Sequence, residues 1–142
     1  MEFSGPVIDK LSMDDRFTMS NMAIEAGGVT GIIDPDAITL EYIKQSHKSK
    51  FKNLKSDKNA YYEKIYEYDV SKLEPLVACP HLPSNVKPAS QLKNIKLDQV
   101  VIGSCTNGRI SDLRISAKIM KGKKIKSGLK LIIIPATQKI YL

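Results

Sequence analysis

Residues 99–108 read Gln-Val-Val-Ile-Gly-Ser-Cys-Thr-Asn-Gly, a short apolar run rich in β-branched residues that leads into a glycine-bounded turn. A second apolar run occupies residues 131–134 and ends at Pro135. Between the two runs, apolar side chains recur at helical spacing, at Ile110, Leu113, Ala117 and Met120. Strand, turn, helix and strand predict a βαβ unit, whose parallel strands read as continuous apolar runs because both faces are covered.

The turn places Cys105 between the end of the first predicted strand and the start of the predicted helix. Ligands of parallel sheets gather at the carboxyl ends of strands. A helix N-terminus also favours a thiolate, which is both a nucleophile and a metal ligand. From the residues alone, two interpretations stay open: a reactive or metal-binding thiolate, and a small buried thiol in a tight turn.

An amphipathic helix is expected over residues 13–26. Ser12 and Asp15 have the spacing of a capping box, and Gly27-Gly28 would end the helix. Asn21 and Glu25 lie four residues apart and would share one helix face, presenting an amide and a carboxylate to a common ligand. Spacing alone is equally compatible with an exposed polar face.

The remaining segments carry simpler patterns. Asp34-Pro35-Asp36 predicts the start of a second helix, and residues 46–60 predict a Lys-rich surface segment. Alternation over residues 64–70 predicts a strand with Tyr66 and Tyr68 on one face. Four prolines at residues 75–88 predict an extended link and a domain boundary near residue 75.

Composition limits the classes of function. The 142 residues carry a net charge of +7, supplied mainly by lysines near residues 44–64 and 118–130. A Lys-rich nucleic-acid-binding module is one alternative, but base reading favours arginine forks, so a solvated surface is preferred. No run approaches the ~20 apolar residues of a membrane span. Two cysteines make no disulfide scaffold, which favours the cytoplasm.

Cys79-Pro80-His81 is a weak candidate metal pair, because no CxxC motif or further histidine cluster accompanies it. The other histidine, His47, lies in the Lys-rich stretch. A structural role is therefore favoured for the pair.

Two long segments resemble signatures of the aconitase superfamily. Residues 101–114 (VIGSCTNGRISDLR) resemble the segment around its first cluster cysteine, and residues 11–28 (LSMDDRFTMSNMAIEAGG) resemble its upstream signature. The similarity extends over essentially the whole chain. It implies an α/β fold, namely parts of two aconitase-like three-layer domains with parallel-sheet βαβ units. Residues 1–74 would belong to one domain with the active-site helix, and residues 75–142 would begin the next.

The resemblance also implies a chemistry. Members of this superfamily dehydrate and rehydrate hydroxy-acids with a [4Fe-4S] cluster that three cysteines hold, and the open iron acts as a Lewis acid. Cys105 matches the first cluster cysteine. Asn21 and Glu25 match the helix pair around the open iron, as a substrate-binding and a catalytic residue, and Arg109 is a further candidate for substrate binding.

The amino-acid sequences of both segments resemble those of large subunits that interconvert 2-isopropylmalate and 3-isopropylmalate in leucine biosynthesis. Homoaconitase is the alternative. The implied partners are a separate small subunit and a small hydroxy-dicarboxylic acid. The CxxC that holds the other two cluster cysteines in this superfamily does not occur here. We therefore expect a central fragment that binds no cluster and has no activity by itself.

Overall fold

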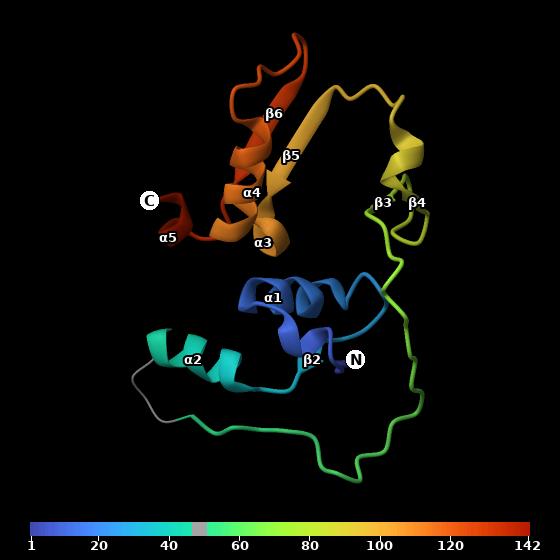
Figure 1. Cartoon of the computed structure of the whole chain (residues 1–142), viewed down its shortest axis with the longest axis vertical. Helices are drawn as coiled ribbons and strands as arrows, with labels where there is room; N and C mark the ends of the chain where they lie inside the picture. Colours follow the sequence, from blue (N-terminus) through green and yellow to red (C-terminus); the bar gives the residue numbers. More distant parts are fainter. Residues whose placement is uncertain (47–50) are drawn as a thin grey trace. The chain divides into compact units, whose positions relative to one another are not determined.

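The computed structural model describes residues 1–46 and 51–142, and its secondary structure is mixed α/β (Figure 1). The predicted α/β class is confirmed. His47 lies outside the described residues. The elements follow in the order β1 (Glu2–Phe3), η1 (Ile8–Lys10), α1 (Met13–Met22), β2 (Ile32–Ile33), α2 (Ala37–Ser46), β3 (Leu76–Ala78), β4 (Val86–Pro88), η2 (Ala89–Leu92), β5 (Gln99–Gly103), α3 (Ser104–Asn107), α4 (Ile110–Met120), β6 (Lys130–Ile134) and α5 (Gln138–Tyr141).

The chain divides into two compact units. The first comprises Met1–Ser56 together with Asp98–Leu142, and the second comprises Asp57–Leu97. The first unit contains the parallel pairs β1–β2 and β5–β6, and the second contains the antiparallel pair β3–β4. The domain boundary expected near residue 75 stays a prediction.

The βαβ unit expected from the apolar runs is present. β5 and β6 are parallel, and their register runs from Gln99 opposite Lys130 to Gly103 opposite Ile134. The short helix α3 and the longer α4 connect them, as Figure 1 shows in orange and red. The helix expected after Asp36 is also present as α2.

Helix α1 begins as predicted and ends earlier than predicted. Asp15 N–H donates to Ser12 Oγ over 3.3 Å, and Ser12 N–H donates to the Asp15 carboxylate over 3.1 Å, which completes the capping box. The α-helix stops at Met22, whereas we expected it to continue to residue 26. Residues 23–27 instead form turns with three-residue hydrogen bonds, which tighten the end of the helix, and Gly27 takes a φ of 82°.

The strand predicted over residues 64–70 is wrong for this structure, since no strand is assigned there. The rings of Tyr66 and Tyr68 do lie on the same side, with centroids 6.3 Å apart and an interplanar angle of 17°. Side chains two residues apart share a face in extended backbone, but a strand also requires a hydrogen-bonded neighbour. Within the described residues, no other strand pairs with this segment.

The proline-rich segment is extended, and it folds back on itself rather than running straight. β3 pairs with β4, with Leu76 opposite Pro88 at the end of the ladder. Pro88 lacks an N–H donor, and the end of a strand tolerates this loss. Ala89 N–H closes the hairpin by donating to the Pro75 carbonyl over 2.9 Å.

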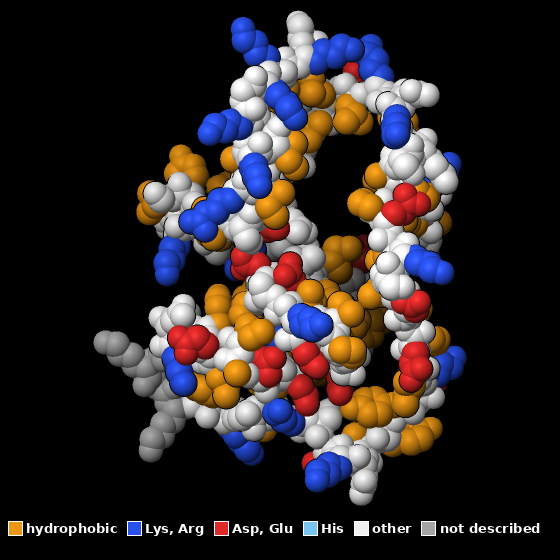
Figure 2. All heavy atoms as spheres, in the orientation of Figure 1, with side chains coloured by type: hydrophobic (Ala, Val, Ile, Leu, Met, Phe, Trp, Pro, Cys, Tyr) orange, Lys and Arg blue, Asp and Glu red, His pale blue; other side chains and the backbone are white. Residues whose placement is uncertain are grey.

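Little of the apolar surface is covered. Among the described residues, Ala23 is the only hydrophobic side chain classed as buried, with 2% of its surface exposed. The chain exposes 12,338 Å², whereas a compact monomer of 15.8 kDa exposes about 7,300 Å². Hydrophobic side chains are accordingly visible over both units in Figure 2. These uncovered faces are suited to pack against further protein.

Basic side chains gather along α4 and the loop that follows it, as the blue spheres of Figure 2 show. They belong to the lysine cluster at residues 118–130. Among the described residues, no helix is long and apolar enough to cross a membrane.

Candidate functional site: a cysteine turn against helix α1

The turn that carries Cys105 is built directly on the end of strand β6. Gly103 has a φ of 108°, and a side chain at this position would collide with the carbonyl of Ile134. A side chain at Gly108 would meet the same carbonyl and the Ala136 nitrogen, both at 2.7 Å. Glycine is therefore required at both ends of the turn, because a backbone segment occupies the space of a Cβ.

Backbone geometry at the turn is unusual at one more position. Ser104 has a φ of 77°, in the left-handed region that residues with a side chain rarely adopt. Ala136 N–H donates to the Gly108 carbonyl over 2.9 Å, so the segment after β6 holds the far end of the turn. The surrounding structure thus imposes a strained conformation immediately before Cys105.

The Cys105 thiol is exposed and surrounded by hydrogen-bonding side chains. Its Sγ lies 3.7 Å from Thr106 Oγ1 and 3.9 Å from Ser104 Oγ. Hydrogen bonds with the side chains of Thr106, Ser104 and Asn21 hold the pKa of the Cys105 thiol below its usual value. An accessible thiolate in a polar setting is suited to bind a metal, whereas a buried structural thiol would lack these partners.

Helix α1 lies against this turn through a stripe of polar residues. The Thr18 hydroxyl donates to the Thr106 carbonyl over 3.3 Å, and the Ser111 hydroxyl donates to the Asp14 carboxylate. Asn21 lies one turn beyond Thr18 on the same helix face, and its side-chain amide helps to lower the pKa of the Cys105 thiol. Residues at positions i, i+4 and i+7 lie on one helix face, so Asp14, Thr18 and Asn21 form a single contact stripe.

Arg109 follows the turn and contacts α1 through an aromatic ring. The guanidinium carbon of Arg109 lies 4.7 Å from the centroid of Phe17, a cation–π geometry. Phe17 is in turn 5.4 Å from the ring of Tyr42, edge to face. The Arg109 Nε is buried and has no hydrogen-bond partner in the described part of the chain.

Glu25 lies apart from the other candidate residues. It is exposed and occupies the turns after α1, not the helix face that carries Asn21. Within the described residues, no hydrogen bond or ion pair joins its carboxylate to Asn21 or Cys105. The structure therefore places Asn21 on the helix face that meets the cysteine turn and places Glu25 in the exposed turns after α1.

The opposite face of α1 is fixed by Arg16, which is only 3% exposed. Its guanidinium binds both carboxylate oxygens of Asp36 at 2.7 Å, and Nη1 also donates to Thr39 Oγ1 over 3.1 Å. The remaining donors meet the carbonyls of Leu11 and Asp9. This ion pair lowers the pKa of the Asp36 carboxyl far below its usual range and raises that of Arg16.

The described residues match one ligand of an iron–sulfur cluster and not a complete set. Cys105 offers an exposed, hydrogen-bonded sulfur, which is the donor type that such clusters require. Nowhere in residues 1–46 and 51–142 do three His, Cys, Asp or Glu side chains form a group that could hold a metal ion. Cys79 lies in the β3–β4 hairpin, where its Sγ contacts the Val77 carbonyl at 3.9 Å.

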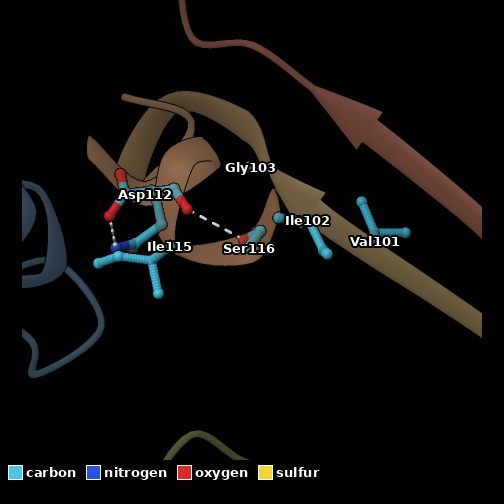
Figure 3. Close-up of a pocket in the computed structure, with 7 residues that line it drawn as sticks. Val101, Ile102, Gly103, Asp112, Ile115 and Ser116 are labelled. Atoms are coloured by element: carbon cyan, nitrogen blue, oxygen red, sulfur yellow. Dashed lines mark hydrogen bonds between the residues drawn. The ribbon is translucent and has the colours of Figure 1, made fainter. Parts of the chain in front are cut away.

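A groove of about 390 Å³ lies beside the cysteine turn, between β5 and α4 (Figure 3). It is lined by Val101, Ile102, Gly103, Asn107, Asp112, Ile115 and Ser116. The Asp112 carboxylate accepts from the Arg109 N–H over 3.1 Å and from Asn107 Nδ2 over 3.3 Å, which fixes the start of α4. Cys105 does not line the groove, so the groove is distinct from the candidate metal ligand.

Thr18, Ser111 and Arg16 are the site residues that the sequence analysis did not single out. Thr18 has a local signal, because it shares a helix face with Asn21 at a spacing of three residues. Arg16 and Ser111 bind partners that lie 20 and 97 residues away, and local spacing contains no information on such pairs.

Comparison with known proteins identifies the class. The model of the aconitase family (aconitate hydratase) matches residues 1–94 and 82–142, and the chain belongs to this family. The chain is 60% identical over its full length to the 3-isopropylmalate dehydratase large subunit of Thermodesulfovibrio yellowstonii, of which it covers 34%. It is 57% identical over 99% of its length to large subunit 1 of Pyrococcus abyssi, again covering 34%. It is 56% identical over 99% of its length to the 3-isopropylmalate dehydratase large subunit of Caldicellulosiruptor saccharolyticus, of which it covers 33%.

These comparisons confirm the resemblance carried by residues 11–28 and 101–114. The chain spans about a third of the length of the curated relatives that it matches.

Proposed function

We propose that this chain supplies a cluster-ligand cysteine and the adjoining substrate-facing helix to a two-subunit [4Fe-4S] hydro-lyase. The proposed reaction interconverts 2-isopropylmalate and 3-isopropylmalate by dehydration and rehydration, in the cytoplasm, as part of leucine biosynthesis. The observation that carries the proposal is the contact of α1 with the cysteine turn, where the Thr18 hydroxyl donates to the Thr106 carbonyl over 3.3 Å beside Cys105. The relatives named as dehydratase large subunits support the substrate and the need for a small subunit.

Cys105 is the proposed cluster ligand of this chain. When the cluster is bound, its open iron provides a Lewis acid for loss of the substrate hydroxyl. Thr106, Ser104 and Asn21 stabilise the Cys105 thiolate by hydrogen bonds, which favours the ligating form of the side chain.

The other candidate residues act on the substrate in this proposal. Asn21 orients the bound hydroxy-acid with its amide while it supports the Cys105 sulfur. Arg109 offers its guanidinium to a substrate carboxylate, since arginine binds carboxylates through paired N–H donors. Glu25 exchanges a proton between its carboxylate and the hydroxyl that leaves and returns.

The test uses the protein expressed from its complete reading frame, together with its small subunit, after anaerobic reconstitution with iron and sulfide. We expect interconversion of the two isopropylmalates. C105S should remove activity and lower the iron content, whereas the matched control C79S should retain both. N21A should keep its iron and lose activity by about 10–100-fold, as for residues that support a metal ligand.

Two results would contradict the proposal. An active C105S enzyme with full iron would exclude Cys105 as a ligand. If the enzyme converts homocitrate and not isopropylmalate, the protein is a homoaconitase.

The chain of 142 residues is expected to bind no cluster and to show no activity by itself. Iron and sulfide analysis after reconstitution of the isolated chain checks this expectation, and one [4Fe-4S] cluster per chain would refute it.

A further inference from the structure

We infer that Arg16 and Asp36 are a positioning pair that fixes the rotation of helix α1, so that the polar stripe of Asp14, Thr18 and Asn21 stays against the cysteine turn and the start of α4. Neither residue touches the cysteine turn. Both would act through the helix that they hold. The inference rests on the proposed function only for its effect on turnover, because the contact that it explains is a feature of the structure.

The first step is the completeness of the Arg16 contacts. Its guanidinium binds the two oxygens of Asp36, the Thr39 hydroxyl and the carbonyls of Leu11 and Asp9. These partners come from η1, the segment before α1 and the start of α2. A guanidinium is planar and rigid, so five contacts in several directions fix its position and the helix position from which it projects.

The second step is the direction of Arg16 on the helix. An α-helix turns by about 100° per residue, so Arg16 and Asn21 point about 140° apart. Asp14, Thr18 and Asn21 lie within about 60° of one another on the face that meets the cysteine turn. Arg16 therefore holds α1 from behind while the polar stripe faces the turn.

The third step is the kind of packing on the face of α1 that carries Arg16. There α1 packs on Gly31 through Ser20 and Ala23, and a side chain at Gly31 would lie 2.7 Å from the Ser20 Cα. Small side chains in close contact define the distance between two backbones better than the rotation of a helix. Phe17 adds a ring contact with Tyr42 of α2, whereas the five contacts of Arg16 define a direction. The Arg16–Asp36 ion pair joins α1 to the residue that precedes α2, at an N–O distance of 2.7 Å.

The simpler interpretation is that Arg16 contributes only to folding stability. A stabilising pair and a positioning pair differ in what happens to the molecules that remain folded. Loss of a stabilising pair lowers the folded fraction, and each folded molecule works normally. Loss of a positioning pair leaves folded molecules in which Asn21 has moved away from Cys105.

The experiment compares R16M, R16K, D36N and the exchanged double variant R16D/D36R in the complete enzyme with its small subunit. S12A serves as the matched control, because it removes the capping box of the same helix and leaves the Arg16 contacts in place. Measurements are made at a temperature where each variant is folded by circular dichroism. The first readout is kcat and KM per iron-loaded site.

The second readout needs neither cluster nor substrate. It is the rate at which a neutral maleimide alkylates Cys105 in the metal-free C79S protein at constant pH, with the modified peptide identified by mass spectrometry. The Cys105 sulfur is already exposed, so a displaced α1 changes its hydrogen bonds and not its accessibility. Loss of the Asn21 hydrogen bond disfavours the reactive thiolate and lowers this rate.

We expect R16M to lower kcat per loaded site by about tenfold or more, because small displacements of a positioned group have large kinetic effects. Alkylation of Cys105 should be several times slower, because the thiolate loses a stabilising hydrogen bond. R16K and D36N should be intermediate, and the exchanged double variant should recover part of the lost kcat and part of the lost alkylation rate. S12A should match the wild type in both readouts. If R16M does not fold, R16K and D36N replace it in the comparison. Both should then show lower kcat and slower alkylation relative to S12A.

Wild-type kcat and alkylation rates in folded R16M would overturn the inference and leave a stabilising role. Equal losses in S12A would assign the effect to general loosening of α1 and would also overturn it. If the wild type fails to act on isopropylmalate and R16M still slows alkylation, the positioning role stands and the proposed function falls.

Discussion

The βαβ segment from β5 to β6 and the tyrosine-rich segment at residues 61–70 carry equally clear sequence patterns, yet only the first contains strands. β5 finds its partner β6 one helix later in the same segment. Residues 64–70 alternate as a strand should, and Tyr66 stacks on Tyr68, but no described strand lies beside them. The difference shows that a pattern decides which side chains share a face, while a neighbouring strand decides whether a ladder forms.

The largest expected effect tests how closely the cysteine turn depends on β6. G103A introduces a Cβ where the Ile134 carbonyl lies, so we expect a loss of more than about 3 kcal/mol in the free energy of unfolding. G122A is the matched control, because Gly122 also has a positive φ, 73°, but open space around it. It should cost only about 1 kcal/mol. Urea denaturation of the complete protein measures both, and equal losses would show that the turn is not seated on β6.

The second effect concerns acid stability of the unit that contains β5 and β6. The Asp36 carboxyl has a folded pKa far below its ordinary value of 3.8, chiefly because the Arg16 guanidinium binds it. A depressed folded pKa gives stability that is present above the unfolded pKa and is lost as the pH falls below about 4.

With Asp36 about a third exposed, we expect this acid-sensitive part to be about 1–2 kcal/mol. Denaturation of wild type and D36N at pH 7 and pH 3 checks the sign, since the difference between the two proteins should shrink in acid. If wild type and D36N differ in free energy of unfolding by the same amount at pH 7 and pH 3, the ion pair is not the cause of the difference.

The smallest effect compares side chains of the two patterned segments directly. V100A shortens a partly covered residue of β5 and should cost about 1 kcal/mol. Y66A removes a ring that is 67% exposed and should change the free energy of unfolding by less than about 0.5 kcal/mol. A larger loss for Y66A in the complete protein would reveal a neighbouring strand that covers residues 64–70 there.

Much of the local structure could be predicted from the sequence. The capping box of Ser12 and Asp15, the start of α2 after Asp36 and the cysteine turn between β5 and α4 all depend on residues close in the chain. The turn glycines were also expected, although the reason is more specific than flexibility. Gly103 and Gly108 are required because the end of β6 lies against them.

The rest depends on contacts that no local pattern contains. The contact of helix α1 with the cysteine turn was expected only from the resemblance to a known family, because 88 residues separate Thr18 from Thr106. In the sequence, Arg16 is an ordinary charged residue near the start of a helix. Its pairing with Asp36 depends on the path of the chain between α1 and α2, which no local pattern predicts. Glu25 was placed on the Asn21 face by helical spacing, which no longer applies once the helix ends at Met22.

The seating of the cysteine turn on the end of β6 sets an order of events during biosynthesis. Residues 103–108 leave the ribosome before residues 130–136. Yet the turn packs against the carbonyl of Ile134 and accepts a hydrogen bond from the N–H of Ala136. A nascent chain that has not yet reached residue 136 lacks the backbone contacts that hold the cysteine turn. The turn that holds Cys105 therefore takes this shape only after β6 has emerged and paired with β5.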